Sequence, residues 1–147
     1  FHDELTGGKV QPVLETCRQA ARAAHVEITN LVIPGYNDSD EQFEELAAWI
    51  EANLGADTPL HLSAYFPRHH LSAPPTPTAT LLHARNIASR RLKYVYLGNI
   101  ASDVGADTVC PECGNLLVER VAMHARIAGL DGTRCANCGA NAHIIVD

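Results

Sequence analysis

Short apolar runs recur along the first hundred residues of the chain. They cover 26–33, 60–66 and 94–97, so their starts at 26, 60 and 94 are 34 residues apart. Each run is rich in strand-favouring residues and is followed by proline or glycine, which end strands. Between the runs, apolar residues repeat every three or four positions, as on one side of a helix. The pattern predicts three strands that alternate with helices.

Three helices are expected in the intervening segments. Their apolar stripes repeat at helical spacing and would face a core. The first runs to about Ala24, and the third closes on the basic segment 90–93, where cations suit the helix dipole. The second has a capping-box signal at its start. The starts are Pro12 for the first helix, Asp38 or Ser39 with Glu41 or Gln42 for the second, and Thr78 or Thr80 for the third.

These units predict an α/β fold with a parallel sheet. Tandem helical-hairpin repeats can have a similar period, but they would not contain the strand-like segment 26–33. Parallel strands joined by helices are expected to be buried on both faces, with functional loops beyond their carboxyl ends. Three strands are too few to close a barrel and leave two open edges. We therefore expect residues 1–104 to be a fragment of a larger α/β domain whose other strands precede residue 1.

The end of the chain carries two cysteine hooks, each followed by glycine. A pair of Cys-x2-Cys hooks can enclose one tetrahedral metal ion, and glycine allows the backbone amides to turn toward the sulfurs. Residues 105–147 are therefore expected to form a small four-cysteine domain of zinc-ribbon-like or rubredoxin-like type, with a hairpin formed by 116–121 and a return through 131–132. The expected ligands are Cys110, Cys113, Cys135 and Cys138.

Zinc is the favoured ion, because nothing near the hooks suggests electron transfer. Iron, including an auxiliary iron–sulfur cluster, also accepts four thiolates. Two disulfides are a further alternative, which would need an oxidising compartment. His124 and His143 are expected to be bystanders, and Cys17 is expected to be a small buried apolar residue on the first helix.

Composition narrows the function classes. Hydrophobic residues make up 46% and charged residues 19% of the chain, with a net charge of −6, which disfavours a dedicated nucleic-acid binder. No apolar run approaches the roughly 20 residues of a membrane helix. There is also no signal-like start. We expect a cytoplasmic protein without a membrane or nucleic-acid partner.

Three loops follow the predicted strands. Residues 34–38 have the composition of a tight turn. Residues 66–78 form a long, proline-rich loop, and long loops at this end of an α/β unit are often functional. It contains His69 and His70, whose side chains diverge on an extended chain and are not expected to bind one metal. The third loop, 98–100, begins with a glycine that can bring backbone close to a ligand.

Five segments of the chain carry a resemblance to a known family. They are 27–38, 59–67, 74–77, 93–99 and the two cysteine hooks. In their order and spacing these segments resemble the C-terminal half of the AmmeMemoRadiSam system radical SAM enzymes, and the resemblance covers nearly the whole chain. A more distant likeness connects the stretch 32–38 with the activating enzymes of glycyl radical enzymes, such as that of pyruvate formate-lyase.

This resemblance implies a partial (β/α)6 barrel that holds a [4Fe-4S] cluster and S-adenosylmethionine. Such enzymes generate a 5'-deoxyadenosyl radical that abstracts hydrogen from a substrate, which the sequence does not identify. The family holds its cluster with Cys-x3-Cys-x2-Cys, a spacing absent here, so this segment alone is expected to be inactive. The family is also linked with Memo-type and AMMECR-type proteins, which are the implied partners.

Within such a barrel, side chains near the carboxyl ends of the strands face the cofactor. The expected cofactor contacts are Glu27, Asn30, Tyr65 and Asn99. Two positions depart from the related activating enzymes, which have a basic residue in place of Glu27 and a histidine in place of Phe66. The alternative function is a non-catalytic zinc-ribbon adaptor, in which the α/β part is a scaffold.

Overall fold

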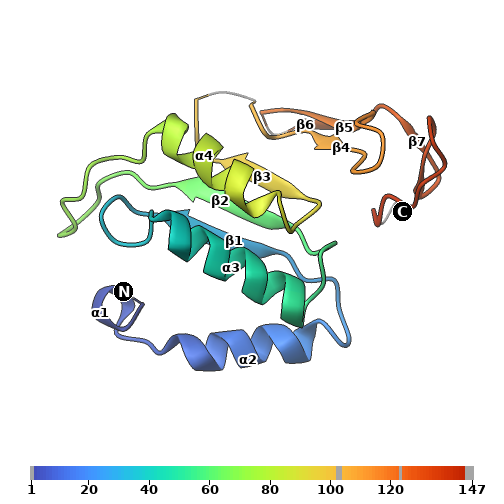
Figure 1. The fold of residues 1–147 in the computed structure, drawn as a ribbon. Helices are drawn as coiled ribbons and strands as arrows, with labels where there is room; N and C mark the ends of the chain where they lie inside the picture. The colour runs from blue at the N-terminus through green and yellow to red at the C-terminus, as the bar shows by residue number, and fades with distance from the viewer. Residues whose placement is uncertain (1, 102–103, 123, 145–147) are drawn as a thin grey trace.

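The structure is a computed structural model that describes residues 2–101, 104–122 and 124–144. The α/β part comes first in the chain and the cysteine-containing part follows it (Figure 1). The first part contains α1 (His2–Thr6), α2 (Val10–Ala20), β1 (Ile28–Val32), α3 (Asp40–Asn53), β2 (Leu60–Ala64), α4 (Thr78–Ala88) and β3 (Val95–Gly98). The second contains β4 (Thr108–Val109), β5 (Leu116–Val121), β6 (His124–Ile127), β7 (Leu130–Asp131) and β8 (Arg134–Cys135).

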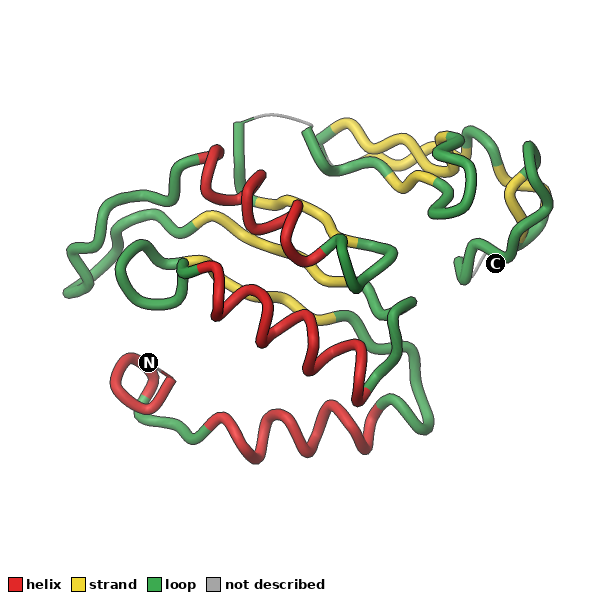
Figure 2. The backbone as a smooth tube through the Cα atoms, viewed as in Figure 1, coloured by secondary structure: helices red, strands yellow, loops and turns green. Residues whose placement is uncertain are grey.

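The first three strands form a parallel sheet in the order β1-β2-β3, which confirms the predicted α/β class. Ile28 pairs with Leu60, and Leu60 pairs with Val95, so every second residue of the three strands faces the same way. Helices α3 and α4 pack on that face, side by side, as Figure 2 shows. The buried core between helices and sheet includes Val32, Phe43, Ala47, Ile50, Leu60, Leu62, Leu81, Ala84, Val95 and Leu97.

The opposite face of the sheet differs from the prediction that both faces would be buried. Among the described residues no helix packs on it, and its side chains are partly or fully exposed, including Leu31 at 44%. The alternation is clearest in β2, where buried Leu60 and Leu62 flank the half-buried His61. This open face consists of Thr29, Leu31, His61, Ser63, Tyr96 and Gly98.

Helix α2 lies beside α3 without a buried residue of its own. Arg18 holds it there, since its Nε donates to the Asn53 Oδ1 atom at 2.8 Å and its guanidinium lies over the Trp49 ring. The helix begins at Val10, two residues before the predicted Pro12. Proline is tolerated there because the first amides of a helix have no acceptor within it.

The predicted capping box of α3 is confirmed at Ser39. The Ser39 hydroxyl accepts from the Gln42 amide at 3.3 Å, and the Gln42 side chain accepts from the Ser39 amide at 3.2 Å. Asp38 instead accepts from the Gly35 amide within the preceding turn. Helix α4 begins at Thr78 as expected, but Pro77 occupies its N-cap and no side chain caps it.

We predict that Ser39→Ala destabilises the protein by about 1 kcal/mol, because the backbone amide of Gln42 loses the hydroxyl that accepts its hydrogen bond and the capping box is broken. Urea denaturation followed by circular dichroism measures the change. Thr78→Ala is the matched control, since Thr78 is the exposed first residue of α4 and makes no capping bond. An equal effect of the two substitutions would contradict the role of Ser39.

The loops that follow the strands meet at the carboxyl end of the sheet. Buried Ile33, Tyr65 and Ala73 pack together there, with Leu5 and Leu71 partly buried against them. The Thr76 hydroxyl lies within the cluster and donates to the Val32 carbonyl. The long loop 66–77 is therefore anchored at its middle and at its end.

The second part of the chain forms two small antiparallel sheets, β4-β5-β6 and β7-β8. The predicted hairpin starts at β5 as expected, but the strand that returns beside it is β6. Residues 131–132 lie instead at the end of β7 and in the turn that leads to β8. The second cysteine hook thus has its own short hairpin. No helix among the described residues is long and apolar enough to cross a membrane.

Candidate metal centre

The two cysteine hooks have the same backbone geometry. In the first, the Gly114 amide donates to the Cys110 carbonyl at 2.8 Å, and Gly114 has a φ of 72°. In the second, the Gly139 amide donates to the Cys135 carbonyl at 2.8 Å, and Gly139 has a φ of 75°. Positive φ is the conformation that glycine adopts without strain, which explains why glycine follows each hook.

The hooks bring four sulfurs together. Ligand atoms of Cys110, Cys113, Cys135 and Cys138 all lie within 4.8 Å of one another. The Sγ atoms of Cys110 and Cys138 are 3.6 Å apart, and those of Cys113 and Cys135 are 3.7 Å apart. A tetrahedral ion with bonds of about 2.3 Å to sulfur requires edges of about 3.8 Å. The four predicted ligands therefore fit a tetrahedral metal ion such as zinc.

The same distances disfavour the disulfide alternative. A disulfide bond is about 2.05 Å long, and each cysteine of the hooks is a free thiol in the structure. Cys110 and Cys135 are buried at 2% exposure, whereas Cys113 and Cys138 are exposed. One ligand of each hook thus lies in the small core and the other lies at the surface.

The thiols of the cluster differ in pKa. Hydrogen bonds from the Asn137 side chain and the Asn115 backbone lower the pKa of Cys113 to about 6. The Ala140 backbone amide favours the Cys138 thiolate, but the neighbouring Cys113 and burial outweigh it and raise the pKa of Cys138 to about 12. Since metal ligands are thiolates, a bound dication would stabilise the fully deprotonated cluster.

Other candidate ligands lie elsewhere. Among the described residues no further group of three His, Cys, Asp or Glu side chains brings its ligand atoms within the same distance. His124 is exposed on β6, and His143 faces Asp57 at 3.7 Å. Cys17 is half-buried on α2, where full burial was expected. His69 and His70 are exposed in the long loop.

The four-cysteine cluster and the long loop 66–77 lie at opposite ends of the parallel sheet. The Tyr94 hydroxyl, just before β3, donates to the Ala142 carbonyl at 2.6 Å, which ties the cysteine-containing part to the amino ends of the strands. The loop 66–77 extends from the carboxyl ends of the strands, at the left of Figure 1, whereas the cysteine-containing part lies at the right. The four-cysteine cluster is thus remote from the edge where α/β folds usually place their active groups.

The four expected cofactor contacts do not form one site. Glu27 lies before β1, where its carboxylate contacts the Nε2 atoms of His25 at 3.1 Å and His61 at 2.7 Å. Partial burial raises the pKa of Glu27, but these two hydrogen bonds outweigh it and lower that pKa below its usual value. Asn30 lies on the helix-covered face, where its Oδ1 atom accepts from the Asn37 side-chain Nδ2 at 3.3 Å.

The other two contacts lie at the carboxyl end of the sheet. The Tyr65 side chain is buried, and its hydroxyl donates to the Leu71 carbonyl at 2.8 Å. Asn99 has a φ of 58° and donates from Nδ2 to the Ala64 carbonyl at 2.8 Å. Tyr65 and Asn99 are therefore neighbours at this edge, while Glu27 lies at the opposite edge.

A polar cluster that the sequence did not reveal surrounds Glu27. His61 stacks on the Tyr96 ring with centroids 5.1 Å apart, and Arg120 lies over the same ring at 5.2 Å. The signal available in the sequence was the alternation of polar and apolar residues in β2. Alternation marks a strand with one covered and one open face, whereas strands buried on both faces are apolar throughout.

No protein-family model matches the chain. It is similar to an uncharacterized protein, MJ0808, of Methanocaldococcus jannaschii, with 41% identity over 151 aligned positions. The alignment covers 99% of this chain and 45% of the archaeal protein. The chain therefore spans somewhat less than half the length of this relative.

Proposed function

We propose that this chain is the C-terminal part of a radical SAM enzyme of the AmmeMemoRadiSam type, with the four-cysteine unit as a structural zinc site. The way the sheet is wound carries the proposal. Consecutive strands are neighbours in the order β1-β2-β3, and both connecting helices lie on one face. A doubly wound sheet has helices on both faces, whereas a (β/α) barrel keeps them all outside.

The edge of the sheet at β1 supports a longer barrel. The side chains of Val10 and Val13 on α2 are 41% and 48% exposed, and Leu31 on the open face is 44% exposed. A further parallel strand beside β1 and beneath α2 would cover this apolar surface, with α2 as its crossover helix. The relative MJ0808 is more than twice the length of the aligned segment, which leaves room for such strands.

The cluster that holds S-adenosylmethionine would not be bound by the four cysteines described above. They lie at the amino end of the sheet and have Cys-x2-Cys spacing, while no Cys-x3-Cys-x2-Cys occurs in this chain. When bound, S-adenosylmethionine and a [4Fe-4S] cluster supply hydrogen abstraction. This chain would contribute the wall formed by the open face and the carboxyl-end residues Tyr65 and Asn99.

The test uses the full-length protein that contains this segment, prepared without oxygen. We expect metal analysis to find zinc in addition to iron, and electron paramagnetic resonance to detect a reduced [4Fe-4S] cluster. Addition of S-adenosylmethionine and a reductant should release 5'-deoxyadenosine. Asn99→Ala should lower its rate of formation, whereas Thr78→Ala, on the exposed start of α4, should not.

A full-length protein with zinc but without an iron–sulfur cluster or 5'-deoxyadenosine would overturn the enzyme proposal. It would favour the zinc-ribbon adaptor, which is supported by exposed apolar residues on the β5-β6 hairpin. Val121 and Ile127 on the β5-β6 hairpin are 54% and 58% exposed, and all of β6 is exposed. Memo-type and AMMECR-type proteins are the proposed partners of the enzyme, since they follow from the family resemblance alone.

A further inference from the structure

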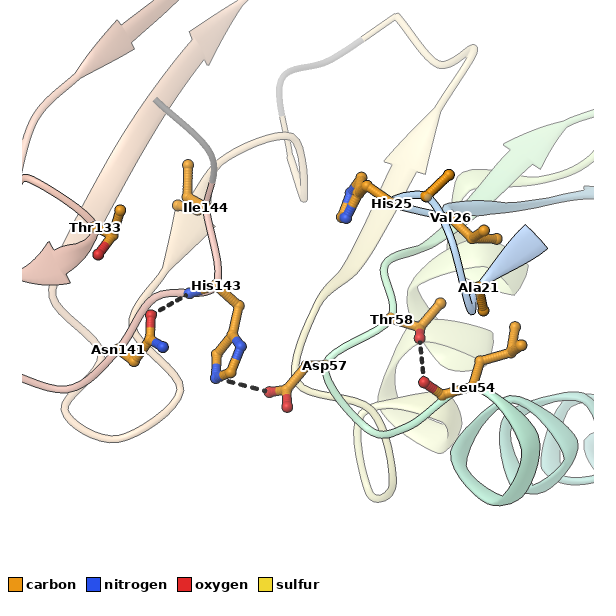
Figure 3. Close-up of a pocket in the computed structure, with 11 residues that line it drawn as sticks. Ala21, His25, Val26, Leu54, Asp57, Thr58, Thr133, Asn141, His143 and Ile144 are labelled. Carbon is orange, nitrogen blue, oxygen red and sulfur yellow. Dashed lines mark hydrogen bonds and ion pairs between the residues drawn. The ribbon is translucent and has the colours of Figure 1, made fainter. Parts of the chain in front are cut away.

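A cleft separates the α/β part from the cysteine-containing part at the amino end of the sheet. It has two lobes of about 430 and 400 Å³, and both are lined by His25, Asp57 and His143. Figure 3 shows the first lobe, with His143 directed at Asp57 and His25 on the opposite wall. The two parts of the chain contact each other around this cleft, through His143 and Asp57 and through Tyr94 and Ala142.

Thr108 lines the second lobe and makes a further contact between the two parts. The residue is 1% exposed. Its hydroxyl is 2.8 Å from the Tyr96 hydroxyl and accepts from the Arg120 guanidinium at 2.6 Å. Arg120 also donates to the Ala106 carbonyl and lies over the Tyr96 ring. The Thr108 hydroxyl thus joins the Tyr96 side chain of the parallel sheet to the Arg120 side chain of the cysteine-containing part.

The contacts continue from Tyr96 across the open face. Tyr96 pairs with His61 in the β2-β3 register, and the two rings stack with an interplanar angle of 25°. His61 in turn contacts the Glu27 carboxylate at 2.7 Å. A row of side chains therefore leads from Thr108 through Tyr96 and His61 to the start of β1.

The other end of this row reaches the metal centre through the backbone. Thr108 and Val109 form β4, and the next residue is Cys110. The Cys110 amide donates to the Asn115 carbonyl at 2.8 Å, so the first hook fixes the end of β4. The β4-β5 pairing, in which Thr108 lies opposite Val118, places Arg120 beside Thr108.

We propose that the four-cysteine metal centre positions Tyr96 and His61 on the open face of the sheet, with Thr108 and Arg120 as the positioning residues. Without the metal, the hook no longer fixes β4, and the Thr108 hydroxyl leaves its place beside Tyr96. The stack of Tyr96 on His61 then loosens. If the proposed function holds, the open face lines the barrel interior. Metal loss at one end of the sheet then changes the positions of Tyr96 and His61 inside the barrel.

Nuclear magnetic resonance of the chain tests this without any radical chemistry. The aromatic ring of Tyr96 shields the ring protons of His61, so release of the stack should move the His61 signals downfield. We expect this shift after removal of zinc with a chelator and in Thr108→Val with zinc bound. Thr108→Ser keeps the hydroxyl and should retain the native His61 signals.

His83 is the internal control, since it contacts Asp40 at 2.8 Å on the helix side of the fold. Its signals, and the amide signals of α3 and α4, should stay unchanged in every sample. Native His61 signals in Thr108→Val would overturn the positioning role. So would a Thr108→Ser variant that behaves like Thr108→Val, because it would show that the hydroxyl is not what holds the stack. Neither result bears on the proposed enzyme activity, which is tested separately by 5'-deoxyadenosine formation.

Discussion

Cys113→Ser is expected to unfold the cysteine-containing part while the α/β part stays folded. The small core around the hooks contains Leu117, Val118 and Ala142 as its buried apolar residues, and Cys110 and Cys135 complete it. So little apolar burial does not offset the conformational entropy of a segment of this size. Binding of a structural zinc ion contributes about 10–16 kcal/mol in comparable small domains. Serine removes one of the four thiolates.

Amide hydrogen exchange measures the effect along the chain. We expect protection to fall in 106–122 and 124–144 after Cys113→Ser or after chelation, and to persist in β1, β2 and β3. The parallel sheet keeps its protection because its core is a separate cluster of buried residues. Cys17→Ser is the matched control, since Cys17 lies on α2 outside the cysteine group. Unchanged exchange around the hooks in the chelated protein would contradict a structural metal.

Local signals in the sequence predicted the elements well. The capping box at Ser39 and Gln42 is confirmed because both partners lie within one turn and need no tertiary contact. The hooks are confirmed for the same reason, since each Cys-x2-Cys-Gly turn closes on its own backbone. The three strands begin within two residues of their predicted starts at 26, 60 and 94.

Features that depend on distant residues were less predictable. The return strand of the ribbon was expected at 131–132, but β6 pairs with β5 and that segment closes a separate hairpin. Periodicity alone does not say which of two short strands pairs with β5. The side of the sheet that Asn30 faces also follows from the register with Leu62, which only the assembled sheet defines.

The cluster around Glu27 shows the same limit. Glu27, His61, Tyr96 and Arg120 come from four separate segments, and three different strands bring the last three together. Glu27 was expected among the cofactor contacts although it sits early in the predicted strand 26–33, and in the structure it lies at the amino end of the sheet, before β1. A residue that precedes a parallel strand lies at the edge opposite the usual active-site loops.

Gly129→Ala is expected to weaken zinc binding by about 10- to 100-fold, although Gly129 is not a ligand. A methyl group at this position would collide with the Leu116 carbonyl oxygen and the Asn115 side chain. Gly129 also links β5 to the second hook, because its amide donates to the Leu117 carbonyl at 3.2 Å and its carbonyl accepts from the Ala136 amide at 2.9 Å. Steric overlap of this kind costs about 1–3 kcal/mol.

That cost appears as lost metal affinity because zinc binding and folding of the ribbon are coupled, and about 1.4 kcal/mol corresponds to a factor of about ten. Competition with a chromophoric chelator measures the affinity. Gly132→Asn is the control: Gly132 has a φ of 58°, which asparagine tolerates, and no atom lies within 4 Å of its added carbon. Its affinity should stay near that of the unmodified chain. Equal affinity of the Gly129→Ala and unmodified proteins would show that the close approach of 116 and 129 does not determine the geometry of the metal centre.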